Sequence, residues 1–188
     1  MQNNLFKSAL HYELKNEMEM PEVDWVAPDE FPDLRSCDYI AIDLETCDPN
    51  LLTKGPGWVR KDGFIVGVAI AAGDFTGYYP IKHEGGGNIS GNLVKRWLKD
   101  QLATPHIPKI MHNALYDLGW LRSANIPIQG QIIDTMIAAP LIDENRFSYS
   151  LNNLGKDYLS KYKEERGLRA AAKAFGVDPK KDLWKLPA

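Results

Sequence analysis

The apolar residues of this chain follow two spacings, one typical of strands and one typical of helices. Three short apolar runs come early, at residues 39–46, 64–71 and 77–81, and the turn residues Gly73 and Asp74 separate the last two. Runs of this length that contain Ile, Val and Tyr favour β-strands, and short turns between successive strands favour antiparallel pairing. We therefore predict that the domain begins with a three-stranded meander.

The second half of the chain alternates helical patterns with two very short strands. Ser90 is a suitable N-cap for the first of these helices, and Gly176 is a suitable C-terminal stop for the last. The short strands are expected at residues 109–111 and 132–133. The helices are expected at residues 93–102, 114–124, 136–141, 149–162 and 168–175. A meander followed by alternating helices and strands predicts an α/β domain with a mixed sheet.

The composition is that of one ordinary soluble domain. A length of 188 residues is enough for one hydrophobic core and short for two, and 44% apolar with 25% charged residues is typical of globular proteins. The net charge of −3 neither indicates nor excludes nucleic-acid binding. Cys37 and Cys47 lack the spacing of a zinc site and are expected to be reduced thiols. Because no apolar run reaches the length of a membrane span, the expected location is the cytoplasm.

Residues 1–36 are predicted to form an N-terminal extension that packs on a domain formed by residues 37–188. Prolines interrupt the extension, so no long helix or strand is expected there. Trp25 and Phe31 are expected to anchor it against the domain.

Two carboxylates lie at the end of the first predicted strand. Asp43 and Glu45 are two residues apart, so both side chains point to the same face of that strand. Two neighbouring carboxylates repel each other, and one takes up a proton unless a cation lies between them, which favours a divalent metal site. The alternative is a solvated strand end or a helix cap with no chemical role.

A second polar cluster is formed by His112-Asn113-Ala114-Leu115-Tyr116-Asp117. If a helix begins near Asn113, Asn113 and Asp117 face the same way, because they are four residues apart. The preceding short strand would then bring Asp117 to the face of Asp43 and Glu45 as a third carboxylate. The alternative is that Asn113 is an ordinary N-cap and Asp117 a solvated acid of the first helical turn.

Together, three segments closely resemble the 3′→5′ exonuclease domain of family A DNA polymerases, with phage polymerases the most similar. These segments are Ile-Asp-Leu-Glu-Thr, His-Asn-Ala-Leu-Tyr-Asp-Leu-Gly-Trp-Leu and Ile-Asp-Thr-Met. They correspond to the first two exonuclease motifs of the DEDD superfamily and the segment that follows them. The resemblance extends from about Tyr39 to the last helices, and it implies an RNase H-like mixed sheet flanked by helices.

The resemblance also implies an activity and a set of site residues. The activity would be metal-dependent 3′→5′ exonucleolytic proofreading of single-stranded DNA 3′ ends, with two Mg²⁺ or Mn²⁺ ions in a two-metal hydrolysis. Oxygen-only ligation agrees with these ions better than with zinc. The catalytic metal ligands would be Asp43, Glu45 and Asp117. The residues that line the channel for the terminal nucleotide would be Thr46, His112, Asn113 and Tyr116.

Several neighbouring residues are weaker candidates for supporting roles. Asp134 follows a short strand like a fourth acid, but its place before a helix favours an N-cap, and the resemblance makes it a residue that supports the fold near the site. The candidates for contacts with substrate phosphates are Arg60, Lys61 and His112, followed by Arg146 and Lys156.

The last motif of the family, Tyr-x-x-x-Asp or His-x-x-x-x-Asp, is missing. It supplies a fourth carboxylate and a residue that orients the attacking water. Tyr149 is followed four residues later by Asn153, and no histidine follows His112. We expect a fragment cut short of this motif, with little activity alone unless an acid such as Asp178 substitutes.

Three functions are open on this basis. The first is a proofreading domain that shares its full-length chain with a polymerase domain, in a phage-infected or bacterial cell. The second is an exoribonuclease of the RNase D kind. The third is a catalytically silent nucleic-acid-binding module, which the missing motif favours and the three intact acids disfavour.

Overall fold

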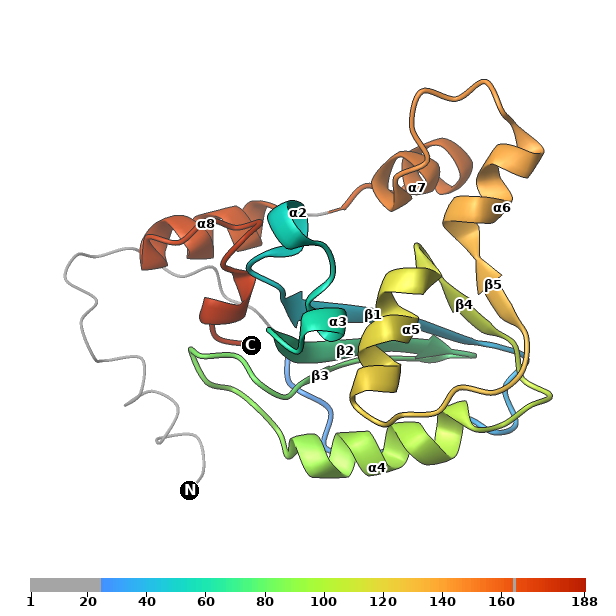
Figure 1. The fold of residues 1–188 in the computed structure, drawn as a ribbon, viewed down its shortest axis with the longest axis horizontal. Helices are drawn as coiled ribbons and strands as arrows, with labels where there is room; N and C mark the ends of the chain where they lie inside the picture. Colours follow the sequence, from blue (N-terminus) through green and yellow to red (C-terminus); the bar gives the residue numbers. More distant parts are fainter. Residues whose placement is uncertain (1–24, 164) are drawn as a thin grey trace.

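A mixed five-stranded sheet lies at the centre of the molecule (Figure 1). The computed structural model describes residues 25–163 and 165–188. In spatial order the strands are β3 (Phe75–Pro80), β2 (Phe64–Ala72), β1 (Ile40–Cys47), β4 (Lys109–Met111) and β5 (Ile132–Asp134). Strands β1, β2 and β3 pair antiparallel, while β4 is parallel to both β1 and β5. The predicted meander and the predicted α/β class are therefore confirmed.

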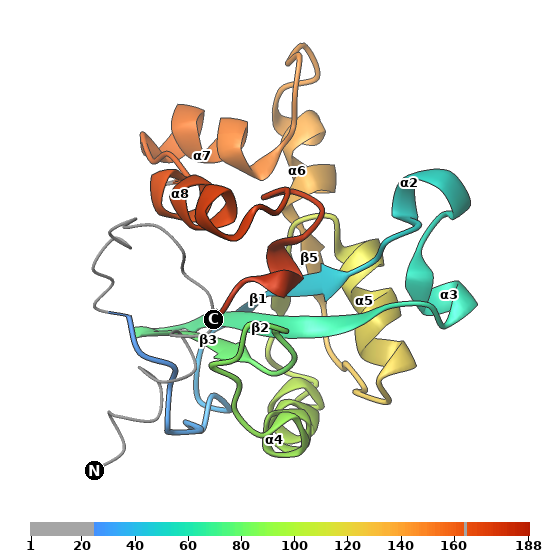
Figure 2. The ribbon, with the colours of Figure 1, turned by 90° about the vertical axis from the view of Figure 1, so that its left-hand side faces the viewer.

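Helices cover both faces of this sheet (Figures 1 and 2). Helix α4 lies on one side, α7 and α8 lie on the other, and α5 connects β4 with β5. The helices are α2 (Leu51–Lys54), α3 (Gly57–Arg60), α4 (Gly91–Leu102), α5 (Ala114–Ser123), α6 (Thr135–Ile142), α7 (Leu151–Leu159) and α8 (Arg166–Phe175), with a final 3₁₀ turn η1 (Leu183–Lys185). Within the described part of the chain, no helix is both long and apolar enough to cross a membrane.

Two helix ends differ in detail from the predictions. Helix α7 is shorter than expected, because Ser160 adopts a left-handed conformation and its amide bonds back to the Lys156 carbonyl. Ser90 occupies the N-cap position of α4, but its side chain makes no capping hydrogen bond. Gly176 ends α8 in the left-handed conformation, as predicted.

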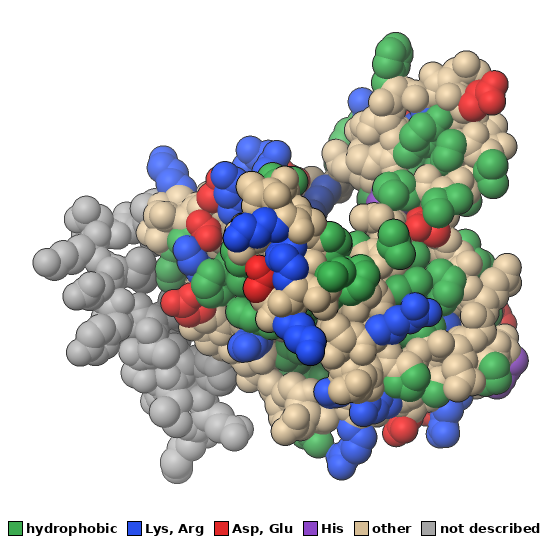
Figure 3. All heavy atoms as spheres, in the orientation of Figure 1, with side chains coloured by type: hydrophobic (Ala, Val, Ile, Leu, Met, Phe, Trp, Pro, Cys, Tyr) green, Lys and Arg blue, Asp and Glu red, His purple; other side chains and the backbone are tan. Residues whose placement is uncertain are grey.

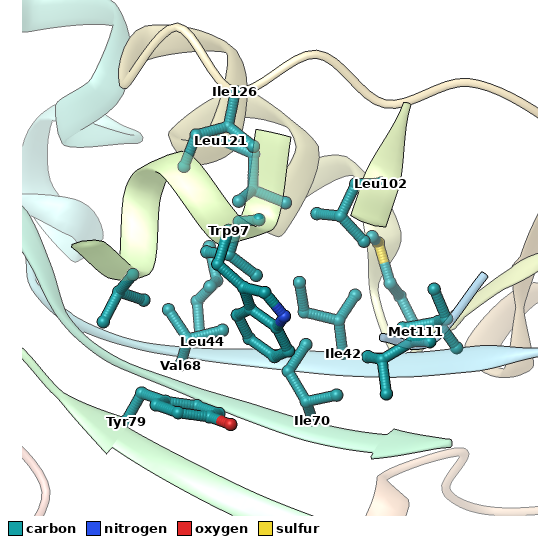
Figure 4. Packing of buried hydrophobic residues seen from close by; sticks show 14 of the residues in the cluster. Ile42, Leu44, Val68, Ile70, Tyr79, Trp97, Leu102, Met111, Leu121 and Ile126 are labelled. Atoms are coloured by element: carbon teal, nitrogen blue, oxygen red, sulfur yellow. The ribbon is translucent and has the colours of Figure 1, made fainter. Parts of the chain in front are cut away.

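The hydrophobic core lies between the sheet and α4 (Figure 4). Alternate residues of β1 and β2 point into it, and Trp97 of α4 packs above them next to Tyr79, with ring centroids 4.8 Å apart. Phe31 stacks on Tyr79 at 5.4 Å, so the predicted anchoring by Phe31 is confirmed. Residues 1–24 of the predicted extension lie outside the described residues.

The opposite face of the sheet is called the open face below. Because side chains alternate along a strand, Asp43 and Glu45 point to this face while Ile42 and Leu44 point into the core. Their direct partners on β2 are Ala69 and Gly67, which are small. Neither partner carries a large side chain of its own over this part of the face.

Lys109 fixes the strand that leads to the second polar cluster. It is fully buried in β4, and its ammonium donates hydrogen bonds to the carbonyls of Thr104, Ile107 (2.9 Å) and Gln129 (2.7 Å). Burial lowers the pKa of Lys109. These bonds tie the loop before β4 and the loop before β5 to β4.

Replacing Lys109 with Met is expected to destabilise the fold. The variant leaves three carbonyl groups without their donor, which is expected to lower the free energy of unfolding by roughly 3 kcal/mol. Urea denaturation followed by circular dichroism measures the loss, with Lys54→Met as a control because the Lys54 side chain is exposed. Equal effects of the two substitutions would show that the buried hydrogen bonds of Lys109 do not stabilise the fold.

Candidate active site

The end of β1 places Thr46 beside α5. Pairing with β2 passes from Glu45–Gly67 to Thr46–Ile65, so Val66 is an extra residue that forms a β-bulge. The Thr46 hydroxyl lies 2.9 Å from the Tyr116 hydroxyl. Two of the predicted channel residues, from segments far apart in the sequence, are thus in direct contact.

Asp48 extends this contact into the loop after β1. The Tyr116 hydroxyl donates to Asp48 Oδ2 (3.0 Å), and the Gly57 amide donates to the same oxygen (2.9 Å). Since Tyr116 donates to Asp48, Thr46 is the donor to Tyr116. The sequence interpretation did not single out Asp48, because a lone aspartate in a loop carries no motif signal.

Two candidate phosphate contacts are committed to protein groups. The Arg60 guanidinium pairs with Asp62 at 2.7 Å and donates to the Lys54 carbonyl at 2.8 Å. Arg146 pairs with Asp157 and lies over the Tyr158 ring. Both arginines pair with acids of their own segments, and their contact with substrate phosphates stays a prediction.

Asp134 caps two helices at once. Its carboxylate accepts from the Met136 amide of α6 (2.9 Å), which confirms the predicted N-cap. It also accepts from the amides of Asn113 (3.0 Å) and Ala114 (2.8 Å) at the start of α5. Asn113 occupies the N-cap position of α5, but it is in the left-handed conformation and its side chain makes no capping bond, so the alternative of an ordinary Asn113 cap is wrong. The Asp134 carboxylate thus accepts three backbone hydrogen bonds, two on Oδ1 and one on Oδ2.

Asp117 is buried in the first turn of α5, with 4% of its surface exposed. The backbone amide of Leu44 lowers the pKa of both Asp117 and Asp43, so the two carboxylates share a close neighbour. Asp117 is therefore next to β1, and the alternative of a solvated first-turn acid is excluded.

The three carboxylates destabilise one another's charged forms. Burial, followed by the charges of Asp43, Asp134 and Glu45, raises the pKa of Asp117 to about 7. Burial and then Asp43 raise the pKa of Glu45. Desolvation by the surrounding protein also raises the pKa of Asp43, although its side chain is still open to solvent. Without a cation, this group holds protons above the ordinary range for acids.

His112 is oriented by a residue that the sequence interpretation missed. Thr135 donates its hydroxyl hydrogen to the Met111 carbonyl (3.2 Å), so it accepts from His112 Nδ1–H (2.9 Å). His112 and Asp43 also line an open cavity of about 270 Å³, together with Leu151 of α7.

Lys163 brings a positive charge to the acids. It lies between α7 and α8, and its backbone amide donates to Asn152 Oδ1 (3.1 Å). Its charge lowers the pKa of both Asp43 and Glu45, which partly offsets desolvation. Lys163 belongs to no motif, so only the folded arrangement indicates its proximity to the site.

The donor chemistry fits a hard divalent cation. Carboxylate oxygens are the ligands that Mg²⁺ and Mn²⁺ prefer, and a cation would replace the protons that the raised pKa values imply. Asp43, Glu45 and Asp117 could hold such an ion. In their present arrangement, no three His, Cys, Asp or Glu side chains among the described residues lie close enough together to hold a metal ion.

The later acids are engaged elsewhere. Glu165 pairs with Arg169, and Asp182 pairs with Lys185. The carboxylate of Asp178, the suggested substitute ligand, accepts from the backbone amide of Lys180 (2.8 Å). No fourth carboxylate that joins the other three is evident in the part of the chain that the structure describes.

Comparison with known proteins gives a consistent result. Residues 29–174 match the family model described as 3′-5′ exonuclease, of the kind found in DNA polymerase A. The chain is 40% identical over 171 residues to a DNA-directed DNA polymerase of Pseudomonas phage M6, covering 88% of this chain and 26% of that protein. It therefore spans about a quarter of that relative's length.

Solved structures agree on an RNase H-like fold. NrnC of Brucella melitensis bound to pGG is 26% identical with a TM-score of 0.53, over 71% of this chain and 58% of that one. The same protein with bound Mg²⁺ is 27% identical with a TM-score of 0.51, over 70% of this chain and 58% of that one.

The Asp117→Asn variant is expected to remove a pH-dependent loss of stability. The pKa of Asp117 is raised from 3.8 to about 7, so the folded chain binds this proton more tightly than the unfolded chain does. Stability of the metal-free protein should therefore fall as pH rises from about 4 to 7. At pH 8 with EDTA, we expect the variant to be more stable than the wild type by roughly 2 kcal/mol in urea denaturation.

Asp74→Asn, in an exposed turn, is the matched control and should leave the pH dependence unchanged. Added Mg²⁺ should stabilise the wild type more than Asp117→Asn. A variant that is less stable than the wild type at pH 8 in EDTA would contradict the electrostatic origin of the shift.

Proposed function

Since the chain belongs to the 3′-5′ exonuclease family of DNA polymerase A, we propose that it removes nucleotides from the 3′ end of single-stranded DNA in proofreading. The observation that carries this proposal is the placement of Asp117 against the Asp43 end of β1, with the pKa values of Asp43, Glu45 and Asp117 all raised. Such a group of acids is stable in its charged form when cations are bound to it.

The proposed ligands are the three carboxylates, in a site for two Mg²⁺ or Mn²⁺ ions. When bound, these ions would supply an activated water and stabilise the leaving 3′-oxygen. Asp43 is open to solvent, Glu45 is half-buried and Asp117 is buried, so the acids extend from the surface inwards. A phosphodiester can therefore approach from the open face.

The neighbouring residues are suited to orient the terminal nucleotide. Thr46 and Tyr116 hold each other and are fixed to the loop by Asp48, so their positions do not depend on substrate. His112 is held by Thr135 at the cavity beside Asp43. Asn113 has its backbone fixed by Asp134 while its side chain is exposed. We propose that these four residues contact the sugar and base of the 3′-terminal nucleotide.

Lys163 is a candidate for the contact with phosphate. Its charge already acts on Asp43 and Glu45. A cation near this acidic group would favour the approach of an anionic backbone. Lys163 joins the earlier candidates for this contact, of which Arg60 and Arg146 pair with acids of their own segments.

We further propose that a polymerase domain accompanies this domain in the full-length chain. The phage M6 relative is a polymerase about four times as long as the matching region. Helices α6 and α7 and their connection expose several large apolar side chains, and Figure 3 shows hydrophobic side chains on this projecting part of the molecule. Exposed apolar patches of this kind often mark contacts with other protein surfaces. The exposed residues are Ile137, Leu141, Ile142, Phe147 and Leu159.

Degradation of a 5′-labelled single-stranded DNA tests the proposed activity. With Mn²⁺ or Mg²⁺, we expect a ladder of products that shorten from the 3′ end and no cleavage in EDTA. The rate should be low, because no fourth carboxylate joins the other three among the described residues. Asp43→Ala should lower the rate by at least about a hundredfold, because it removes a proposed metal ligand. Asp74→Ala should leave the rate unchanged.

An RNA strand of the same sequence separates the two nuclease functions. Faster degradation of RNA than of DNA would favour an exoribonuclease of the RNase D kind. Release of the 5′ label as a mononucleotide, internal cuts, or full activity in Asp43→Ala would contradict the proposal.

A further inference from the structure

A tyrosine outside the exonuclease motifs lies on the open face beside Glu45. Tyr78 on β3 pairs with Ala69 on β2, and Ala69 pairs with Asp43 on β1. Residues directly opposite each other in antiparallel strands point to the same face of the sheet. Tyr78 therefore shares the open face with Asp43 and Glu45.

Gly67 provides the space for the Tyr78 ring. Gly67 pairs with Glu45, and a Cβ atom at residue 67 would overlap the ring and hydroxyl oxygen of Tyr78. The phenol thus lies directly over Gly67 and next to Glu45. In agreement, burial and then the charge of Glu45 raise the pKa of Tyr78. The ring of Trp25 packs on Tyr78, with centroids 6.0 Å apart.

His83 fixes the Tyr78 hydroxyl. His83 Nε2 lies 2.6 Å from Tyr78 Oη, and His83 Nδ1 lies 3.0 Å from the Leu186 carbonyl oxygen. A carbonyl only accepts, so Nδ1 carries the hydrogen. Burial lowers the pKa of His83, which favours the neutral ring, so Nε2 accepts from the Tyr78 hydroxyl. The hydrogen bonds therefore run from Tyr78 through His83 to Leu186.

The histidine is itself held at its backbone. The Asn88 side chain accepts from the His83 amide (2.6 Å) and donates to the His83 carbonyl (2.7 Å). His83 is 7% exposed, and both ring nitrogens and both backbone polar groups have partners. A buried polar network that is fully satisfied holds its members in one arrangement.

We propose that Tyr78, held by His83, is a positioning residue that keeps the Glu45 carboxylate directed toward Asp43 and Asp117. The phenol occupies the space over Gly67, the partner of Glu45 on β2, so the Glu45 side chain cannot lie across β2. This inference rests on the proposed nuclease function, because it assigns Glu45 to the metal site. It adds a residue from the edge strand that the exonuclease motifs do not include.

His83 also holds η1 and the residues after it against the loop that follows β3. The bond to Leu186 and the bond from the Glu84 amide to the Trp184 carbonyl (2.9 Å) both serve that purpose. The two uses depend on different ring nitrogens. They are therefore separable by substitution.

Binding of Mn²⁺ tests the proposal without relying on cleavage. Electron paramagnetic resonance measures free Mn²⁺ in titrations of the wild type and of Tyr78→Phe, His83→Asn and His83→Gln. Asparagine retains a donor near Nδ1 for Leu186 and loses the contact with Tyr78, whereas glutamine retains a group near Nε2 for Tyr78. Tyr79→Phe is the matched control, because the Tyr79 hydroxyl donates to the Glu30 carbonyl from the opposite face of the same strand.

We expect Tyr78→Phe and His83→Asn to weaken Mn²⁺ binding about tenfold, which is the usual effect of losing a residue that orients a metal ligand. His83→Gln and Tyr79→Phe should bind as the wild type does. In cleavage assays, excess Mn²⁺ should restore most of the activity of Tyr78→Phe.

Unchanged binding in Tyr78→Phe, equal weakening in Tyr79→Phe, or weakening in His83→Gln but not in His83→Asn would overturn the positioning role alone. Absence of Mn²⁺ binding in the wild type would overturn the metal site of the proposed function as well. The two failures are thereby distinguishable.

Discussion

The electrostatic repulsion among three carboxylates is the constraint on which the site depends. Asp43 and Glu45 share one face of β1, and Asp117 is buried against them from α5. Each is harder to ionise here than in water, because the surrounding protein removes solvent, and for Glu45 and Asp117 the neighbouring acids add negative charge. An arrangement that is unfavourable in isolation becomes favourable when cations enter, so the site couples local stability to ligand binding.

The remainder of the fold keeps these acids in place by hydrogen bonds that do not involve them. Lys109 ties the loops around β4 to the strand that leads into α5. Asp48 ties the loop after β1 to Tyr116. Lys109 is buried and Asp48 is half-buried. Their polar atoms form hydrogen bonds with backbone or hydroxyl groups, as buried polar groups in proteins generally do. The acids thus face the open side while their supports lie behind them.

The fold class and the two acids of β1 were predictable from the sequence. Strand periodicity places Asp43 and Glu45 on one face, and the two motifs occur in a recognisable order. The short strands and the Asp134 cap followed from the same local patterns. The capping of α5 by Asp134 could not be predicted from local patterns, because Asn113 and Asp134 are distant in sequence. Only the pairing of β4 with β5 brings them together. Lys163 and Tyr78 were missed for the same reason. Their proximity to the acids depends on how α7, α8 and β3 are placed, and no local pattern encodes that.

Asp134 has a consequence for how this region opens. One carboxylate accepts hydrogen bonds from the first amides of two helices, so neither helix start can fray without disturbing the other. The beginning of α5 and the beginning of α6 therefore form one cooperative unit, although a strand and a loop separate them in the chain. The start of the projecting α6 and α7 segment is thus joined through this single side chain to the helix turn that carries Asp117.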